Sequence, residues 1–313
     1  MTELLTRASS INRAMDQIGD KWCLLILQEV LWGINTFNEM MQAIGVSRGV
    51  LSNRLQWLQD VDCLRRQLDR GRPRYHMTRK SIELYSVGMM AISWERNWYQ
   101  TPELDQVELV HLNCGQSFHP EIRCGGCQGP INSEQVAFRP GPGARRDVRE
   151  KKVRRRSSKA IEEVPSRRNL YRNLINVVGD RWSSNVIALA YHGIRRFEAF
   201  HAELPVATNI LSDRLQLLVR QGIFEHSQYQ QRPPRYEYLL TAKGRGLYPW
   251  FQMLLQWGDR WCDEAQAGPP MLVVHQPCEQ TLGAEVCCSA CGGLLHGHEV
   301  RFSFEGHGAA VVT

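Results

Sequence analysis

The sequence predicts a mainly helical α+β chain in which one module of helices and a small β-ribbon occurs twice. Two observations predict this class. Short motifs recur in the same order roughly 160 residues apart, and within each copy the apolar residues follow helical spacing before a strand–turn–strand pattern. With 313 residues, of which 43% are apolar and 22% charged, each half is long enough to bury its own core.

The internal repeat is carried by five groups of residues. The offset between the copies grows from 160 to 164 residues along the chain, so their loops differ by small insertions. One module of about 130 residues is therefore used twice. The recurring groups are 19–22 with 179–182, 50–56 with 210–216, 73–75 with 234–236, Trp94 and Trp98 with Trp257 and Trp261, and His111, Cys114, Cys124 and Cys127 with His275, Cys278, Cys288 and Cys291.

The first two helices of the first copy follow from apolar spacing and a capping signal. Ile11, Met15 and Ile18 recur at helical intervals, which predicts a helix before Gly19. Asp20 is expected to cap an apolar second helix over 22–31.

The later elements of the copy include the two-stranded ribbon. A short amphipathic helix is predicted over 37–44, and a further helix begins after Ser47, an expected N-cap. Strands are predicted over 63–68 and 74–78 on either side of a basic turn, followed by a last helix over 81–98. Helices and a ribbon in this order make a winged helix-turn-helix. The second copy repeats the order, with its ribbon over 228–240 and last helix over 243–261.

A basic segment separates the two copies. Residues 144–159 hold nine basic and two acidic residues, so this segment accounts for the whole net charge of +6 and the remainder of the chain is nearly neutral. It has almost no apolar residues, which predicts a flexible or partly helical linker. We expect winged helix-turn-helix domains over 1–100 and 167–264, small zinc-ribbon-like Cys/His segments over 101–138 and 265–313, and the linker over 139–166.

The motifs around residues 18–22, 50–55 and 73–75, with their repeats, resemble the HxlR-type family of bacterial transcriptional regulators. The similarity covers 11–98 and 170–261, more than half of the chain. The resemblance implies sequence-specific DNA binding, usually by homodimers and often under control of a reactive cysteine near the N-terminus. The duplication and the Cys/His segments depart from that pattern. We therefore do not expect the family's dimer geometry or cysteine sensing to carry over directly.

The helix after Ser47, its counterpart in the second copy, and the two basic turns are the predicted DNA-contacting elements. A helix of this length fits the major groove, and arginines at a ribbon tip suit the minor groove or the phosphates. The predicted residues are, in the helices, Ser47, Arg48, Ser52, Asn53 and Arg54 with Thr208, Asn209, Ser212, Asp213 and Arg214, and, at the turns, Arg70, Arg72 and Arg74 with Arg232 and Arg235.

Alternatives remain open for these residues. Arg54 and Arg214 stand beside leucines and could form buried ion pairs inside their modules. The basic turns could be solvated, and the run 151–156 could attract DNA without sequence preference or serve as a solvated spacer. Asp213 would be repelled by phosphate, so we expect it to accept from a cytosine amino group or to brace an arginine.

The pattern His-x2-Cys-x9-Cys-x2-Cys occurs in both copies at identical spacing. Two close pairs of such ligands can form a tetrahedral zinc site, and four protein ligands leave no position open for catalysis. Redox-active Cys-x-x-Cys pairs or unliganded thiols are the alternatives. Cys23, Cys63 and Cys262 lie in apolar surroundings and are expected in the core. The predicted structural zinc sites are His111, Cys114, Cys124 and Cys127, and His275, Cys278, Cys288 and Cys291.

The function predicted from these features is a DNA-binding transcriptional regulator whose two modules read a bipartite operator in duplex DNA, as a covalent pseudo-dimer or as a homodimer of chains. A redox- or metal-responsive regulator with the Cys clusters as sensor is one alternative, and a protein-interaction module that does not bind DNA is another. The chain has no apolar run of membrane-spanning length and starts without a secretory signal, so we expect a cytoplasmic protein at the nucleoid. Phosphate-loop, nucleophile-elbow and dinucleotide-binding patterns are absent from the sequence, so we expect no enzyme.

Overall fold

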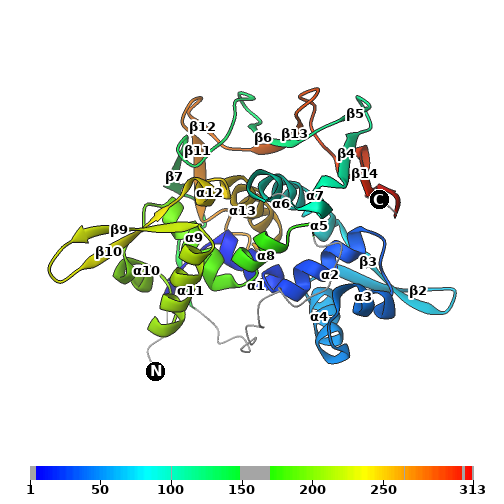
Figure 1. Ribbon diagram of the computed structural model, residues 1–313, viewed down its shortest axis with the longest axis horizontal. Helices are drawn as coiled ribbons and strands as arrows, with labels where there is room; N and C mark the ends of the chain where they lie inside the picture. The colour runs from blue at the N-terminus through cyan, green and yellow to red at the C-terminus, as the bar shows by residue number, and fades with distance from the viewer. Residues whose placement is uncertain (1–4, 100, 149–169, 264, 305–306, 312–313) are drawn as a thin grey trace. The chain divides into compact units, whose positions relative to one another are not determined.

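The computed structural model of the chain describes residues 5–99, 101–148, 170–263, 265–304 and 307–311. The predicted α+β class with two winged helix-turn-helix modules is confirmed (Figure 1). None of the helices in the described ranges is long and apolar enough to span a membrane.

The first module contains α1 to α6 and the ribbon β2–β3. Asp20 caps α2 as predicted, since its carboxylate accepts hydrogen bonds from the backbone N–H groups of Trp22 and Cys23. The predicted last helix divides into a short α5 and a long α6. The bounds are α1 (Ser10–Ile18), α2 (Lys21–Leu31), α3 (Phe37–Ile44), α4 (Arg48–Asp60), β2 (Leu64–Asp69), β3 (Arg72–Met77), α5 (Arg79–Ile82) and α6 (Tyr85–Trp98).

The second module repeats the same order of elements. Asp180 caps α9 through the backbone N–H groups of Trp182 and Ser183, as Asp20 does in the first module. The bounds are α8 (Arg172–Val178), α9 (Arg181–Tyr191), α10 (Phe197–Glu203), α11 (Thr208–Arg220), β9 (Phe224–Gln230), β10 (Arg235–Leu240), α12 (Ala242–Arg245) and α13 (Tyr248–Trp261).

The remaining elements are mostly the short strands of the Cys/His segments. β11 pairs with β12 and β7, β14 pairs with β15 and β4, and β4 also pairs with β5. Their bounds, with those of the N-terminal strand, are β1 (Leu5–Arg7), α7 (Pro102–Asp105), β4 (Val107–His111), β5 (Gln116–Ser117), β6 (Pro120–Cys124), β7 (Val136–Pro140), β8 (Arg146–Val148), β11 (Met271–His275), β12 (Gln280–Thr281), β13 (Ala284–Cys288), η2 (Gly297–Glu299), β14 (Val300–Phe304) and β15 (His307–Val311).

The predicted linker begins later than the sequence suggested. Residues 139–140 complete β7, and β8 pairs antiparallel with β1, with Arg7 opposite Arg146. Backbone pairing orders this stretch despite its few apolar residues. The rest of the linker, including the basic run 151–156, lies outside the described residues.

The chain folds into two compact units, and neither unit is one copy of the repeat. The first unit consists of 1–16, 124–159 and 177–284, and the second of 17–123, 160–176 and 285–313, each in its described part. Each module is therefore completed by segments of the other copy.

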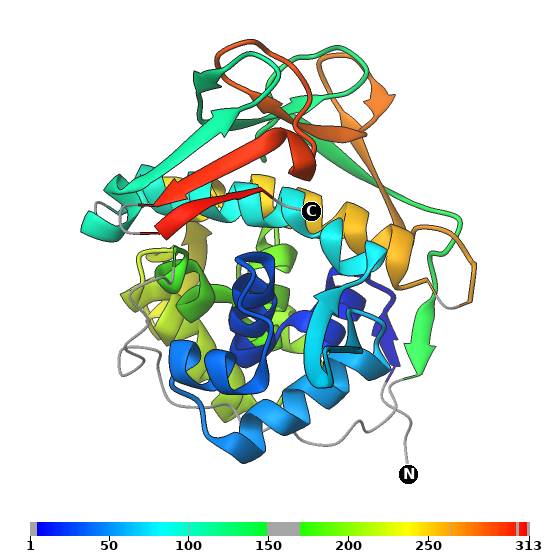
Figure 2. The ribbon, with the colours of Figure 1, turned by 90° about the vertical axis from the view of Figure 1, so that its right-hand side faces the viewer.

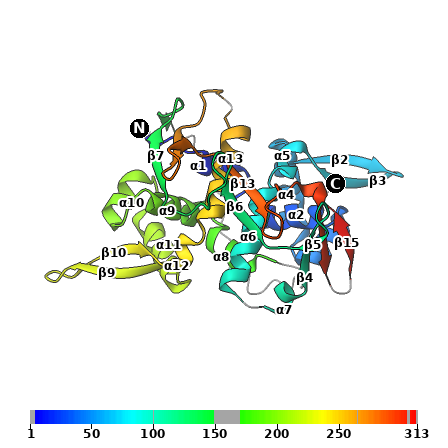
Figure 3. The same ribbon diagram turned by 90° about the horizontal axis from the view of Figure 1, so that it is seen from above.

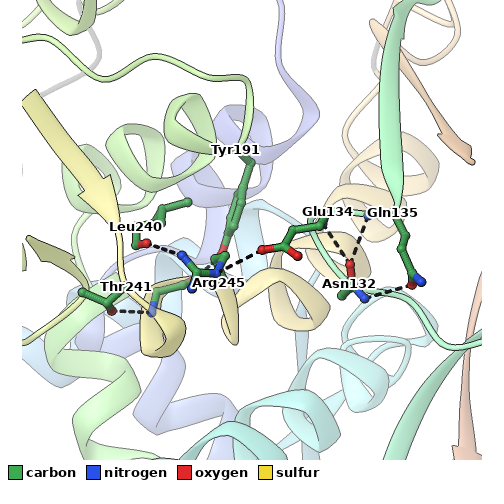
Figure 4. Close-up of polar contacts among 8 residues, drawn as sticks. Asn132, Glu134, Gln135, Tyr191, Leu240, Thr241 and Arg245 are labelled. Carbon is green, nitrogen blue, oxygen red and sulfur yellow. Dashed lines mark hydrogen bonds and ion pairs between the residues drawn. The ribbon is translucent and has the colours of Figure 1, made fainter.

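In the first unit, segments of the first copy bind to the second module. The Ser10 hydroxyl donates to Asp259 on α13 at 2.5 Å, Arg181 on α9 donates to Asp16 at 2.6 Å, and β7 pairs with β11 along five residues. Figure 4 shows a further contact of this kind, in which Glu134 lies 3.4 Å from Arg245 on α12.

In the second unit, segments of the second copy bind reciprocally to the first module. The buried carboxylate of Glu95 on α6 accepts a hydrogen bond of 2.7 Å from the backbone N–H of Leu174 and one of 3.0 Å from Asn173. Strand β14 pairs with β4, seen in Figure 2 as a red strand beside a teal one. A hydrogen bond to a charged group, such as each of the two that the Glu95 carboxylate accepts, stabilises a fold by roughly 1.5–3 kcal/mol.

Candidate nucleic-acid interface and metal centres

The N-terminal half of α4 presents a polar face to solvent. Leu51, Leu55 and Leu58 lie on one side of the helix and are fully buried. The residues predicted to contact DNA on the opposite side, Ser47, Arg48, Ser52 and Asn53, are all exposed. Ser47 occupies the N-cap position without a capping hydrogen bond from its side chain. The guanidinium carbon of Arg48 lies 5.3 Å from the centre of the Phe37 ring, within the range of a cation–π contact.

The structure places Arg54 and Arg214, which were predicted to contact DNA, in ion pairs inside their modules. Arg54 makes two hydrogen bonds of 2.8 and 2.9 Å to the carboxylate of Asp20, and Arg214 lies 2.7 Å from Asp180. The Arg54 and Asp20 side chains are only 17% and 14% exposed. Both guanidinium groups therefore join α4 and α11 to the caps of α2 and α9. This is the ion-pair alternative that the sequence left open.

The corresponding face of α11 is less cationic. Thr208, Asn209 and Asp213 are exposed, and Ser212 is half-buried. In the part of the chain that the structure describes, Asp213 forms no ion pair, so its predicted role of bracing an arginine finds no support there. This face carries hydroxyl, amide and carboxylate groups and no arginine that points outward.

The ribbon β2–β3 ends in a tight turn. Asp69 pairs with Arg72, and the two residues between them, Arg70 and Gly71, have φ values of 49° and 76°. Two left-handed residues at this position match the twist of the strands. Arg70 and Arg72 are exposed as predicted. Arg74 is instead bound within the module, 3.1 Å from Asp69 and 2.7 Å from the Asn35 side-chain oxygen, so it braces the ribbon.

The ribbon β9–β10 has a different surface. Arg232 and Arg235 are exposed near its tip. His226, Tyr236 and Tyr238 form a row of ring contacts along the strands, with centroids 5.0 and 5.7 Å apart. Figure 3 shows this ribbon as a two-stranded arm extending from its module.

Four further arginines belong to these surfaces and were not predicted from the sequence. Arg65 and Arg66 on β2 are both exposed, as is every residue of this strand after Leu64. Arg195 and Arg196 precede α10 and are also exposed, with the Arg196 guanidinium 4.1 Å from the centre of the Tyr229 ring. The available signal was charge, because each pair is a doublet of adjacent arginines in the sequence.

The eight predicted metal ligands come together in two groups, but the predicted grouping within each copy is wrong. The His-x-x-Cys pair of one copy meets the Cys-x-x-Cys pair of the other, and in each group the ligand atoms all lie within 4.8 Å of one another. The physical reason is the exchange of segments described above. We call Cys124, Cys127, His275 and Cys278 the first centre, and His111, Cys114, Cys288 and Cys291 the second centre.

The distances within the centres fit tetrahedral coordination. Zinc bonds of about 2.3 Å to sulfur and 2.0 Å to nitrogen place two sulfurs about 3.8 Å apart and a sulfur and a nitrogen about 3.5 Å apart. In the first centre, the Cys124 and Cys278 sulfurs are 3.9 Å apart, and His275 Nδ1 lies 3.3 and 3.4 Å from the sulfurs of Cys278 and Cys127. In the second centre, His111 Nδ1 lies 3.3 Å from Cys291 Sγ.

The four ligand turns share one backbone geometry. In each, the residue after the second ligand has a left-handed φ, between 58° and 70° at Gly115, Gln128 and Glu279 and 72° at Gly292. Its N–H donates to the carbonyl of the first ligand at 2.7–2.8 Å. This closes each turn and points both ligand side chains to the same side.

Neighbouring groups complete the centres. The second ring nitrogen of His275 lies 3.2 Å from the Pro130 carbonyl, a contact that leaves Nδ1 as the ligand atom. Glycines lie against the ligands, because a Cβ at Gly129 would be 3.3 Å from Cys127 Sγ and one at Gly293 would be 3.3 Å from Cys291 Sγ. These residues fit a metal ion of the zinc type.

The cysteines assigned to the core are buried there. Cys23 and Cys63 have no exposed surface and Cys262 is 4% exposed. Burial raises the pKa of the Cys63 thiol to about 11, which disfavours the reactive thiolate.

Known proteins are similar to part of this chain. An uncharacterized HTH-type transcriptional regulator of Mycobacterium tuberculosis (strain ATCC 25618 / H37Rv) is 35% identical over 118 residues, which make up 38% of this chain and 74% of that protein. The HTH-type transcriptional regulator YodB of Bacillus subtilis (strain 168) is 29% identical over 89 residues, 28% of this chain and 80% of that protein. A solved structure of a transcription-factor candidate from Pseudomonas aeruginosa, 32% identical, covers 39% of this chain and 83% of its own, with a TM-score of 0.31.

The family described as HxlR-like helix-turn-helix matches residues 17–103 and 177–266. These two ranges cover the modules from α2 to α6 and from α9 to α13, and together more than half of the chain. They include α4 and α11 with their exposed polar faces, and both ribbons. The chain therefore belongs to the HxlR-like helix-turn-helix family and contains the family's domain twice.

Proposed function

We propose that this protein is a transcriptional regulator that binds a bipartite operator in duplex DNA with its two winged-helix modules. The observation that carries the proposal is that each compact unit contains the helices and ribbon of one module, from α2 to α6 or from α9 to α13, with an exposed polar face on α4 or α11. Such a helix reads base edges in the major groove, while the ribbon contacts the backbone or the minor groove. Its relatives bear the names of HTH-type transcriptional regulators, which supports the same role.

One chain supplies both modules under this proposal. Where a single-domain regulator needs two chains to read two half-sites, the exchange of segments already joins two modules here. The complex would then contain one chain on each operator, although a homodimer of chains on a longer operator is a measurable alternative. The proposed place of action is the cytoplasm, at the nucleoid.

Selection of bound fragments from random duplexes, followed by affinity measurements, tests this proposal. We expect Asn53→Ala and Asn209→Ala each to lower affinity for the selected site by about tenfold to a hundredfold, the effect of losing one base contact. Asn97→Ala is the matched control, since Asn97 is an exposed asparagine at the end of α6. Unchanged affinity in both reading-helix variants would contradict the assignment of α4 and α11.

We further propose that the two centres hold structural zinc. Three thiolates and one imidazole at tetrahedral distances suit this ion, and no position is left for a substrate. Because each centre takes ligands from both copies, a bound ion closes a chain loop of well over a hundred residues. Its role would be to hold the exchanged segments in place.

A response to oxidants is the second candidate role for the centres. The thiols of Cys127 and Cys291 are exposed, so an oxidant could reach one ligand of each centre. Measurement of zinc release and operator affinity during titration with a mild oxidant tests this. Loss of both together supports a sensor, whereas zinc content and affinity that persist support a purely structural role.

A further inference from the structure

The two ribbons differ strongly in charge. Residues 64–77, which form β2–β3 and its turn, contain five arginines and one aspartate, a net charge of +4. Residues 224–240, which form β9–β10 and its turn, contain two arginines and two glutamates, a net charge of zero. The two copies have the same order of elements, but the net charge on the surface of their ribbons differs.

Four cationic side chains of the first ribbon are directed to solvent. Arg74 and Asp69 pair with each other, so their charges cancel within the ribbon. The other four arginines, Arg65, Arg66, Arg70 and Arg72, are all exposed. Among the residues that the structure describes, no acidic side chain forms an ion pair with any of these four.

The tip of the first ribbon is narrow and stiff. The two-residue turn places Arg70 and Arg72 on either side of Gly71, and Pro73 follows at once. Leu68, opposite Pro73 in the ribbon, is 71% exposed. A slender tip with arginines and one apolar side chain suits the walls and floor of a narrow minor groove, where the negative potential is enhanced.

The second ribbon also exposes two arginines at its tip, Arg232 and Arg235, but acidic residues in its strands offset their charge. Glu225 and Glu237 lie within its strands, and its outward surface includes Tyr236, which is 48% exposed. The cationic residues that distinguish this module, Arg195 and Arg196, lie before α10 instead. Such charges contact phosphates and carry no preference for groove width.

We infer that the two modules make unequal demands on DNA: the β2–β3 ribbon binds a narrow, A·T-rich minor groove on one flank of the operator, and the β9–β10 ribbon requires no such flank. This inference rests on the proposed function and specifies the DNA that it recognises. The operator is then asymmetric although the protein is built from a repeat. Most of the salt dependence that the ribbons contribute comes from the first copy.

The experiment compares matched arginine pairs on the two ribbons. Each neutralised phosphate contributes about 0.9 to the slope of log affinity against log salt. We therefore expect Arg70→Gln with Arg72→Gln to reduce the slope by about 2, and Arg232→Gln with Arg235→Gln to change it by less than half as much. Arg301→Gln, an exposed arginine on β14, controls for net charge.

The operator flanks are tested with the same variants. The selected site is prepared with A·T-rich or G·C-rich sequence on each side in turn, and minor-groove protection is mapped by hydroxyl-radical cleavage. The inference predicts that one flank alone prefers A·T, and that Arg70→Gln with Arg72→Gln abolishes this preference and its protection. Equal flank preferences, or equal slope changes for the two ribbon pairs, would overturn the inference while leaving the proposed function intact. A chain that binds no duplex at low salt would instead contradict the proposed function itself.

Discussion

Each metal centre takes ligands from both copies of the repeat, so the zinc that remains after two cysteines are replaced should depend on which two are chosen. Replacing Cys114 and Cys288 with serine removes two ligands from the second centre and none from the first. Replacing Cys114 and Cys124 removes one ligand from each centre. Both variants lose two thiols, so they are matched in composition and differ only in how the losses are distributed.

The expected magnitudes follow from the number of ligands. A structural zinc site of four ligands binds with a free energy of roughly 10–16 kcal/mol, or about 3 kcal/mol per ligand. The loss of one ligand then weakens a site by roughly a hundredfold, and the loss of two by about ten-thousandfold. The Cys114→Ser, Cys288→Ser variant is expected to keep one tightly bound zinc per chain. The Cys114→Ser, Cys124→Ser variant is expected to keep none that resists a competing chelator.

Zinc per folded chain, measured after dialysis against a chelator of intermediate affinity, is the assay. Circular dichroism on the same samples confirms that the modules are folded, and Cys124→Ser with Cys278→Ser provides the reciprocal control at the first centre. One zinc retained by the Cys114→Ser, Cys124→Ser variant and none by the Cys114→Ser, Cys288→Ser variant would refute the exchanged arrangement and restore grouping within each copy.

Three further predictions concern stability and metal affinity. Asp20→Ala removes both the cap of α2 and the partner of Arg54, so denaturant unfolding should show a free energy of unfolding lower by about 2–4 kcal/mol. A double-mutant cycle with Arg54→Ala should show coupling between the two residues. Additive effects would mean that the pair does not act as a unit. Burial lowers the pKa of His192 to about 4, below its unfolded value of about 6.5, so its contribution to stability is present above pH 6.5 and is lost as the pH falls toward 4. Replacing His192 with Gln should flatten the stability curve in that window, and an unchanged slope between pH 6.5 and 4 counts against this reasoning. Gly293→Ala should lower zinc affinity at the second centre by about tenfold, because the new Cβ would press on Cys291 and His111. Gly283→Ala is the control and should have no effect, because a Cβ at this position faces open space. Equal zinc affinities for the two variants would argue against the close packing at Gly293.

The modules and their order could be predicted from sequence because their signals are local. Asp20 before an apolar run marks a cap, and the leucine spacing of α4 marks a buried face. The leucine spacing also indicates where Arg54 lies on the helix, because this residue comes three positions after Leu51 and four before Leu58. It therefore sits close to the buried face, where a partner such as Asp20 was to be expected.

The grouping of the metal ligands could not be predicted in this way. Both copies carry the same ligand types at the same spacing, so each His-x-x-Cys pair is equally compatible with either Cys-x-x-Cys pair. The choice depends on contacts between residues far apart in the chain, such as Ser10 with Asp259 and Leu174 with Glu95. No local periodicity reports these contacts.

The exposure of Arg65 and Arg66 was missed for a related reason. Alternation along a strand separates inward from outward side chains only where the sheet has a covered face. The ribbon β2–β3 has two strands, and beyond Leu64 all residues of β2 are exposed. Adjacent arginines on such a ribbon both face solvent.

We propose that one chain carries two DNA-reading modules that both bind the operator. Sedimentation of the protein on its selected duplex, combined with a nuclease footprint of the same complex, tests it most directly. We expect one chain per duplex and two protected segments, of which Asn53→Ala weakens one and Asn209→Ala the other. A single protected segment for the unmodified protein, weakened by one of these substitutions and not by the other, or no complex with any duplex at low salt, would contradict it.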